Sequence, residues 1–552
     1  MAKWKNSYDT INSMRTQVKF FQKESVIAIA LIIGMLLLTL LPDIIKWSQT
    51  PVGHTYNPIH NCALDYVLYT NYTKQGLDGQ TTLFDRFTTE IHPGALANPF
   101  YLFLGNVWRV TQITDPNIVY HVSRITLAIV WAVLLYFFIR RSFPSKSGRL
   151  IALFLVLYSA SFPIYRFPEN IFSITTHMTW WSELNPIVRF GFLPAHLMGH
   201  ILMLTTLICF TNKKVRPWMA IIGTITGFFA GLFHTPSLML PLVLLPTWAI
   251  GTGNWKRLIL LIFCLPLSAL SYLILSRQFN SLPWTLAWDF ERQSFAISIP
   301  EYLLGVGPIV PLGILGSFLA WRQKQGRLWI LWASFCILAI ASITSITKLP
   351  IPFIQRLPIT NMRFLQMALP IPLAMLSTYA LLFLKKHLQT WMFTTLMAIL
   401  LFLTLIHIPS SIMMLSKDMF NGPLFQYPTT SWMKAVRSLD DGPMDKAVLS
   451  LPFAGTAIAG NTRRTVYIGR VLSTINLYQK TDQAFLLYAG SMPLCTAYDF
   501  LSKNRIKELF WGYDEKTAGG NLETYPFIRL KNDFGDTKIY EFTEVKPEEC
   551  TL

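Results

Sequence analysis

The chain has 552 residues, of which 52% are hydrophobic and 14% aromatic, while only 14% are charged. Soluble domains carry about 25% charged residues, so this composition indicates a membrane protein and excludes an ordinary soluble domain. The net charge of +18 does not indicate a nucleic-acid partner, because the basic residues gather in the short connections between apolar runs, the pattern of cytoplasmic loops.

A bilayer-spanning helix needs about 20 mostly apolar residues, and the sequence contains about eleven such runs. A polar, basic stretch precedes the first run, and no small-residue cleavage site follows Pro42. We therefore expect a retained anchor with a cytoplasmic N-terminus. The expected spans lie near residues 25–42, 118–139, 149–165, 190–210, 217–234, 236–252, 258–276, 302–320, 328–347, 365–384 and 389–408.

The acidic residues support the same topology. Between residues 26 and 417, every Asp and Glu falls in or beside a connection that this topology places outside. An odd number of spans also places the C-terminal part outside the cytoplasmic (inner) membrane. The expected organisation is a cytoplasmic segment 1–24, a transmembrane domain 25–408 that contains a first outer loop 43–117, and an extracytoplasmic domain 409–552.

The first outer loop carries the leading candidates for chemistry. The stretch "NCALDYVLYTNYTKQGLDGQ" places Asp65 near the start of a helix expected over 62–75, and a second helix is expected over 97–111. Farther along, "FDRFTTEIHPG" contains Glu90 and His92, whose side chains point the same way if this segment is extended. Carboxylate and imidazole groups suit acid–base catalysis or a divalent cation such as Mg²⁺ or Mn²⁺. The alternative is that these residues only solvate the loop.

The second outer loop adds weaker candidates. Glu169 and His177 lie in "RFPENIFSITTHMTWWSELNPIVRF". The pair Trp180 and Trp181 in this loop fits an interfacial anchor, and it could also present an apolar face to a sugar ring.

Three arginines are candidates for binding an anion at membrane level. Arg124 lies about two turns into the second span, where an ionisable residue is a functional candidate. Arg356 and Arg363 lie at the outer border, before the tenth span. Guanidinium groups match phosphate oxygens in shape and charge, although each of these arginines could instead reach lipid headgroups. Together with the carboxylates, they suggest a lipid-linked phosphate substrate.

After the last span the sequence predicts a small α/β domain of roughly 130 residues, large enough for its own core. The stretches "DKAVLSLP", "RRTVYIG", "IKELFWGY" and "TKIYEF" read as strands, and 429–439, 472–489 and 495–504 read as helices. Three of the six cysteines, Cys62, Cys495 and Cys550, lie outside the spans. Three cysteines cannot all pair, so the sequence assigns no disulfide.

These features resemble the GT-C superfamily of integral-membrane glycosyltransferases, closest to bacterial members with an extracytoplasmic C-terminal domain. The resemblance covers most of the chain. It rests on "DYVLYTNYTKQGLDG", "TTEIHPG", "VYHVSR", "FPENIFSI", "MRFLQMALPIPLA", "TRRTVYIGRVLSTINLYQK" and "NRIKELFWGYDEKTAGG". It implies that Asp65 is the first-loop carboxylate that serves as catalytic base or metal ligand, and it matches Glu169 to the second-loop acid. No WWD-type triad is present, only Trp511-Gly-Tyr-Asp514, which disfavours protein N-glycosylation.

The expected function is therefore sugar transfer from a polyprenyl-phosphate or diphosphate donor to a glycan, lipid or protein acceptor at the outer membrane face, with inversion at the sugar carbon. Asp65 and Glu90 are the expected catalytic residues, and Asp65, Glu90 and His92 the metal ligands if a metal is used. Two alternatives stay open: a transporter or flippase of lipid-linked glycans, and a non-catalytic envelope scaffold.

Overall fold

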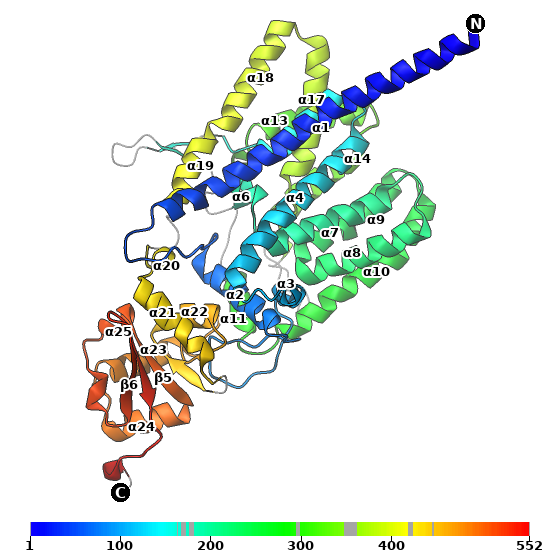
Figure 1. Cartoon of the computed structure of the whole chain (residues 1–552). Coiled ribbons are helices and arrows are strands. Elements are labelled where there is room, and N and C mark those ends of the chain that lie inside the picture. Colours follow the sequence, from blue (N-terminus) through cyan, green and yellow to red (C-terminus); the bar gives the residue numbers. More distant parts are fainter. Residues whose placement is uncertain are drawn as a thin grey trace. The chain divides into compact units, whose positions relative to one another are not determined.

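The computed structural model describes residues 2–162, 164–166, 173–175, 182–293, 298–346, 361–417, 423–443 and 446–550. The chain divides into two compact units. The helical unit comprises Met1–Pro42, Arg124–Tyr272 and Phe295–Leu415. The mixed unit comprises Asp43–Ser123, Leu273–Ser294 and Ser416–Leu552. Figure 1 labels many of the elements of both units.

The helical unit is built almost entirely from helices, with one short antiparallel pair, β1 and β2. Several helices begin with proline at the first or second position, where its missing N–H costs no hydrogen bond, and basic residues end α4 and α17, where they complement the helix dipole. The elements are α1 (Ala2–Ser48), α4 (Pro116–Ser142), α5 (Lys146–Tyr158), β1 (Ile164–Arg166), β2 (Ser173–Thr175), η2 (Ser182–Leu184), α6 (Pro186–Phe190), α7 (Pro194–Thr211), α8 (Pro217–Phe233), α9 (Thr235–Gly251), α10 (Trp255–Gln278), α12 (Ile299–Val306), α13 (Ile309–Arg322), α14 (Arg327–Ile346), α16 (Asn361–Leu365), α17 (Pro370–His387), α18 (Thr390–Leu405) and α19 (His407–Ser416). Of these, α1, α4, α10 and, by one residue, α19 continue into the mixed unit.

Five of the described helices are long and apolar enough to cross a membrane, and a sixth span results if the bent pair α12 and α13, which meet at 91°, counts as one. The five are Lys23–Ser48, Pro116–Ser142, Pro194–Thr211, Trp255–Gln278 and Thr390–Ser416. Shorter apolar helices, among them α8 and α9, accompany them. The chain is therefore a mostly helical membrane protein, and the larger number of about eleven spans stays a prediction.

Close helix packing holds this unit together. A Cβ at Gly316 of α13 would overlap the carbonyl oxygen of Leu376 in α17, so only glycine allows these two helices to approach so closely. The indole of Trp332 in α14 is fully buried, and its Nε1 donates to the carbonyl oxygen of Met367 at 2.9 Å. A polar group buried with a partner in this way avoids the cost of desolvation.

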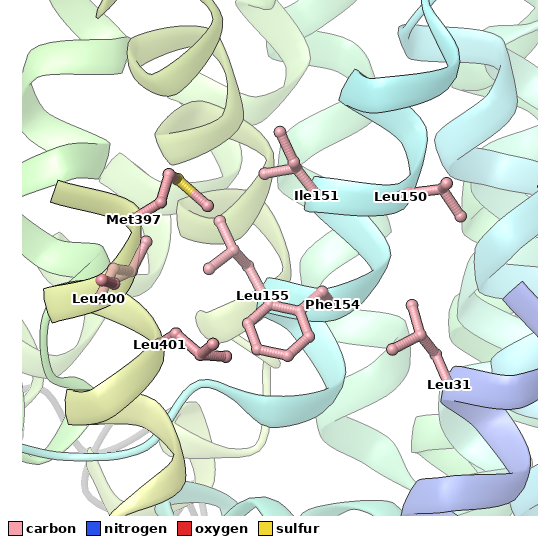
Figure 2. Close-up of a pocket in the computed structure, with 9 residues that line it drawn as sticks. Leu31, Leu150, Ile151, Phe154, Leu155, Met397, Leu400 and Leu401 are labelled. Carbon is pink, nitrogen blue, oxygen red and sulfur yellow. The ribbon is translucent and has the colours of Figure 1, made fainter. Parts of the chain in front are cut away.

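A wholly apolar cavity of about 380 Å³ lies among α1, α5 and α18 of the helical unit. Figure 2 shows its lining, to which Leu31, Phe154 and Leu401 contribute. Its other lining residues are Leu150, Ile151, Leu155, Met397, Ala398 and Leu400. With no polar side chain in its wall, the cavity suits hydrocarbon and offers no hydrogen bond to a polar ligand.

The mixed unit contains a five-stranded sheet in the order β4-β3-β5-β7-β6. The strands β4, β3 and β5 run parallel, while β7 is antiparallel to both β5 and β6. The strands are β3 (Ala447–Leu449), β4 (Thr465–Val466), β5 (Ile506–Trp511), β6 (Ile528–Asp533) and β7 (Lys538–Phe542), and the helices are α2 (Ala63–Leu77), α3 (Pro99–Trp108), η1 (Arg109–Thr111), α11 (Thr285–Gln293), α20 (Pro423–Gln426), α21 (Thr430–Ser438), η3 (Leu439–Asp441), α22 (Pro452–Asn461), α23 (Leu477–Tyr488), α24 (Leu494–Lys503), α25 (Tyr513–Lys516), η4 (Leu522–Thr524) and η5 (Glu548–Cys550).

The four predicted strands and the five predicted helices of this unit are all present, but the sequence analysis missed β6 and α22. The strand β6 is an edge strand in which only Ile528 is buried, so it lacks the alternation of apolar residues that indicates a strand. The helix α22 is made of small residues and is buried nearly all round, so it lacks the polar face of an amphipathic helix.

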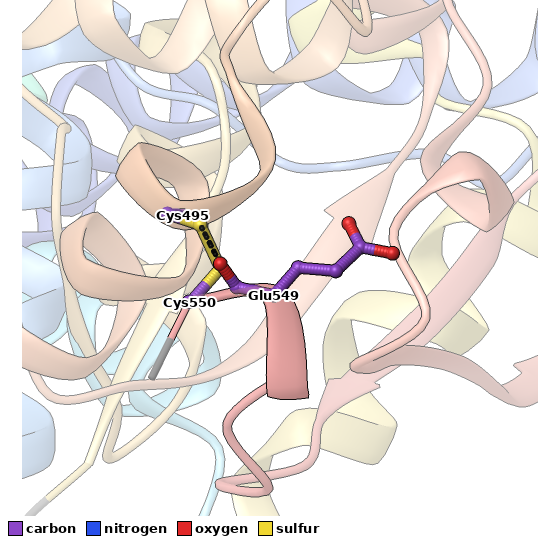
Figure 3. Close-up of a disulfide and its surroundings, with 3 residues drawn as sticks. All are labelled: Cys495, Glu549 and Cys550. Atoms are coloured by element: carbon purple, nitrogen blue, oxygen red, sulfur yellow. Dashed lines mark hydrogen bonds between the residues drawn. A yellow bond between two sulfur atoms is a disulfide. The ribbon is translucent and has the colours of Figure 1, made fainter. Parts of the chain in front are cut away.

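One disulfide corrects the sequence analysis, which assigned none. Cys495 in α24 is bonded to Cys550 in η5, with 5.3 Å between their Cα atoms (Figure 3). Cys62 is a free cysteine. Sequence counting could not choose among the three, because the choice depends on the chain end returning to α24.

The first-loop segment and the C-terminal segment form one body within the mixed unit. The helix α2 packs on α22: Asn71 donates to the carbonyl oxygen of Ala459 at 2.5 Å, and a Cβ at Gly460 would collide with Val67. The backbone N–H of Val466 in β4 donates to the carbonyl oxygen of Arg86 at 2.9 Å. Residues nearly 400 apart in sequence therefore share one core, and the candidate site lies where they meet.

Candidate functional site

Asp65 lies in the first turn of α2, where the helix dipole favours a carboxylate. Its Oδ1 accepts a charge-assisted hydrogen bond from Nη2 of Arg470 at 2.9 Å. The Asp65 side chain is 47% exposed, whereas that of Arg470 is 6% exposed. The pair therefore combines a buried, fixed cation with an acid that solvent or a substrate can reach.

A second acid lies near Arg470. Asp85 is buried, and burial raises its pKa to about 7, although the N–H of Phe87, the charge of Arg470 and Ser473 each act to lower it. Phe87 donates to Asp85 Oδ1 at 2.9 Å. Burial also raises the pKa of the neighbouring Tyr72 well above its ordinary value. Arg470 thus lies near two acids, one exposed and one buried.

Glu90 forms a similar pair with another cation of the C-terminal segment. Lys480 Nζ lies 2.8 Å from Glu90 Oε2, and their side chains are 6% and 35% exposed. Lys480 also donates to the carbonyl oxygen of Tyr467 at 3.2 Å. Partial burial acts to raise the pKa of Glu90, but hydrogen bonds from Lys480 and Thr88 outweigh it, so the pKa lies below its ordinary value.

His92 contacts the backbone of both Asp85 and Glu90. Its Nε2 accepts a hydrogen bond from the N–H of Asp85 at 2.9 Å, and its Nδ1 lies 2.8 Å from the carbonyl oxygen of Glu90. These partners assign the hydrogen to Nδ1 and leave the Nε2 lone pair engaged. Trp284 packs edge-on against the ring at 5.8 Å and donates to the carbonyl oxygen of Pro93 at 3.3 Å.

The three expected metal ligands do not fit a metal in this arrangement. Both nitrogens of His92 have backbone partners, Asp65 is paired with Arg470, and Glu90 with Lys480. Within the described ranges, no three His, Cys, Asp or Glu side chains are grouped so that they could hold a metal ion. A metal ion here would compete with Arg470 for Asp65 Oδ1 and with Lys480 for Glu90 Oε2.

The arginine candidates belong to the helical unit where the structure describes them. Arg124 is buried in α4, and Arg363 is half-buried in α16. Arg124 approaches Gly191, whose added Cβ would lie 3.7 Å from its Nη1. The remaining candidates Arg356, Glu169 and His177 lie outside the described residues.

A polar cluster of three histidines and Gln366 in the helical unit was not predicted from the sequence. Arg363 lies close enough to interact electrostatically with two of these histidines, His196 and His234. The rings of His196 and His234 are 4.2 Å apart, and those of His200 and His234 are 5.7 Å apart. Gln366 links them, since its Oε1 lies 3.2 Å from His234 Nε2 and its carbonyl oxygen 3.1 Å from His200 Nε2. The i, i+4 spacing of His196 and His200 in an apolar helix was the available signal.

Glu183 is the acid of the second outer loop that the structure describes. Glu183 is buried, and Arg189 donates to its carbonyl oxygen at 3.1 Å. Arg189 also donates to the carbonyl oxygens of Val156 and Ser159, at 3.0 Å and 2.8 Å. These backbone bonds give Arg189 a clear structural role at the end of α5.

Comparison with known proteins shows the fold. No protein-family model matches the sequence, and none of the curated proteins matches it. Among solved structures, the apo oligosaccharyltransferase of Archaeoglobus fulgidus aligns with a TM-score of 0.54 and 12% identity, over 91% of this chain and 73% of that one. The same organism's AglB in complex with an inhibitory peptide and a dolichol-phosphate aligns at 0.53 and 13% identity, over 95% and 74%.

ArnT from Cupriavidus metallidurans, bound to undecaprenyl phosphate, aligns with a TM-score of 0.50 and 12% identity, over 94% of this chain and 97% of that one. A further structure of the archaeal oligosaccharyltransferase contains Zn and sulfate. These proteins are GT-C glycosyltransferases, and the chain is similar to them over most of its length. At 12–13% identity this likeness is one of fold, and the chain has the fold of these solved structures.

Proposed function

We propose that the protein is a membrane glycosyltransferase of the GT-C type that moves a sugar from a polyprenyl-phosphate or diphosphate donor to an acceptor. One observation carries this proposal: Asp65, half-exposed at the start of α2, is held by a buried arginine in a GT-C fold. The similar proteins AglB and ArnT bind dolichol-phosphate and undecaprenyl phosphate, which supports a lipid-linked donor.

In the proposed reaction, Asp65 accepts the proton of an acceptor hydroxyl as that oxygen forms a bond to the anomeric carbon of the sugar. The bond from this carbon to the donor phosphate breaks, and the phosphate leaves with the electron pair. Direct displacement inverts the configuration at the sugar carbon. General-base catalysis contributes about 10²- to 10⁴-fold. Glu90, the second candidate catalytic acid, accepts a hydrogen bond from the acceptor.

The remaining candidates have roles in holding the donor. Arg124, Arg356 and Arg363 stabilise the phosphate charge, and the apolar cavity between α1, α5 and α18 suits the hydrocarbon tail. Glu169 and His177 remain second-loop candidates for binding the donor or acceptor. No step in this mechanism requires a metal ion.

We infer that the mixed unit lies outside the cytoplasmic membrane, with the N-terminus in the cytoplasm and about eleven spans between them. The disulfide between Cys495 and Cys550 supports this orientation, because disulfides persist in oxidising compartments and are rare in the cytoplasm. The reaction would then use a donor in the outer leaflet.

The test is sugar transfer by the full chain in proteoliposomes, with a panel of polyprenyl-phosphate sugars and a cell-envelope extract as acceptor. Wild type is compared with Asp65→Asn, which keeps the shape of the side chain and removes the base. Asp482→Asn is the matched control, because Asp482 is an exposed acid on α23 of the same unit. We expect wild type and the control to transfer and Asp65→Asn to lose at least about 10²-fold.

Equal transfer by wild type and Asp65→Asn would refute Asp65 as the base and direct the search to Glu90 and Glu169. No transfer by wild type with any donor would refute the transferase and favour transport of lipid-linked glycans or a scaffold. A flippase assay with a fluorescent lipid-linked glycan in the same vesicles separates these two, since only a transporter moves the glycan between leaflets.

A further inference from the structure

The C-terminal segment supplies a cation to each of the first-loop acids. Arg470 pairs with Asp65 and Lys480 with Glu90, although 405 and 390 residues separate the partners. In both pairs the cation is the buried member and the acid the more exposed one. Because the side chain of a buried cation has little freedom to move, such a pair orients its acid more firmly than two flexible surface side chains would.

Each of the three nitrogens of the Arg470 guanidinium has a hydrogen-bond acceptor. Its Nε donates to the carbonyl oxygen of Leu64 at 3.0 Å, its Nη1 to Ser473 Oγ at 3.4 Å, and its Nη2 to Asp65 Oδ1 at 2.9 Å. The guanidinium thus spans the backbone and the side chain of the first turn of α2. A lysine has no such fork and could satisfy only part of this arrangement.

The turn that carries Arg470 is itself anchored to the first loop. The hydroxyl of Thr474 donates to the carbonyl oxygen of Phe87 at 2.8 Å and accepts from the N–H of Gly469 at 3.0 Å. The N–H of Ile475 donates to Thr88 Oγ1 at 3.3 Å. Arg470 is therefore fixed relative to both ends of the first-loop site, Asp65 and residues 85–90.

We propose that Arg470 is a positioning residue for Asp65: it fixes Oδ1, so that the carboxylate is directed toward the acceptor by a cation of the chain itself. The C-terminal part of the chain is then a component of the site and does more than cover it. This inference rests on the proposed function, because it assigns Arg470 a role only in a reaction for which Asp65 is the base.

The test measures kcat and the donor KM for Arg470→Gln and Arg470→Lys in the proteoliposome assay. The matched control is Arg463→Gln. Arg463 lies in the same segment, its guanidinium pairs with Asp78 at 3.0 Å, and its side chain is more exposed than that of Arg470. We expect Arg470→Gln to lower kcat by about 10- to 100-fold, the scale of a small misplacement of a reacting group, with the donor KM within about twofold of wild type. Arg470→Lys should recover part of kcat, and the control should match wild type.

A structural role would give different results. In the Asp65→Asn background, Arg470→Gln should change the residual transfer by less than about twofold, because the two residues act as one unit. A loss of the same size in both backgrounds, a loss only in KM, or an unchanged kcat would overturn the proposal. Melting temperatures identify unfolded variants, and if Arg470→Gln does not fold, a folded Arg470→Lys with wild-type kcat overturns it equally.

The two proposals fail in distinguishable ways. If wild type transfers no sugar, the proposed function fails and the role of Arg470 falls with it. If wild type transfers and Asp65→Asn does not, while Arg470→Gln keeps its kcat, the transferase stands and only the positioning role is refuted.

Discussion

The buried acid Asp85 makes the mixed unit sensitive to pH in a direction that the structure determines. Its pKa is about 7 in the folded chain, compared with 3.8 for an ordinary aspartate. Between these values the folded state holds a proton that the unfolded state has released. The contribution of Asp85 to stability is therefore present at low pH and is lost as the pH rises to about 7. The substitution Asp85→Asn removes this dependence and keeps an oxygen that can accept the N–H of Phe87.

The size of the effect follows from the two pKa values. One pKa unit corresponds to about 1.4 kcal/mol, so the ionised carboxylate costs the folded state up to about 4 kcal/mol above pH 7. Between pH 5 and pH 8 the expected change in the wild type relative to Asp85→Asn is about 3 kcal/mol. This value is an upper bound, because water entry relieves the burial.

Hydrogen exchange measured by mass spectrometry on peptides that cover residues 84–94 provides the assay. At each pH the exchange rate of the wild type is divided by that of Asp85→Asn, which cancels the intrinsic pH dependence of exchange. The ratio should rise by up to about 100-fold from pH 5 to pH 8, the equivalent of that free-energy change. The exchange rate of the wild type divided by that of Asp482→Asn, the exposed control, should be the same at pH 5 and pH 8. If the ratio of wild type to Asp85→Asn does not change between pH 5 and pH 8, the raised pKa of Asp85 in the folded chain is refuted.

Three further predictions concern the same unit. Chelation by EDTA should leave sugar transfer within about twofold of its starting rate, since the expected metal ligands are engaged in ion pairs and hydrogen bonds; a loss that Mg²⁺ or Mn²⁺ restores would contradict this. Replacing Cys495 and Cys550 together by serine should destabilise the C-terminal segment by about 2–4 kcal/mol, as expected when a disulfide that closes a loop of 55 residues is lost. Thermal unfolding of the wild type with and without reductant checks this, and equal midpoints would contradict it. Glu90→Gln leaves the buried Lys480 without its acidic partner and should destabilise the folded chain by about 1–3 kcal/mol. The double variant Glu90→Gln/Lys480→Met should recover most of that loss. A melting temperature of Glu90→Gln equal to that of wild type would show that the pair contributes nothing.

Some features of this protein follow from local sequence. The apolar runs predict a membrane protein because about 20 consecutive apolar residues have few other stable environments. The helices α2 and α3 and the strands β3, β5 and β7 lie where periodicity and composition place them. The position of Asp65 in the first turn of α2 follows from the same local pattern.

The surroundings of the candidate site were decided by tertiary structure. The sequence identified Asp65, Glu90 and His92 as polar groups of one loop, and equally as ligands of a metal. Only the fold brings Arg470 and Lys480 to the two acids, and only the fold engages both nitrogens of His92. Periodicity reports on neighbours within a few residues, so it cannot predict a partner that lies 405 residues away.

The chain by itself thus determined its membrane class, its local helices and strands, and the acids available for catalysis. The burial of Asp85 and the cations beside the acids were decided by the joining of the first loop to the C-terminal segment. The disulfide between Cys495 and Cys550 was decided by the return of the chain end to α24. The physical reason is that burial and charge pairing are properties of a packed core. Here that core is assembled from segments nearly 400 residues apart, and no local stretch specifies it.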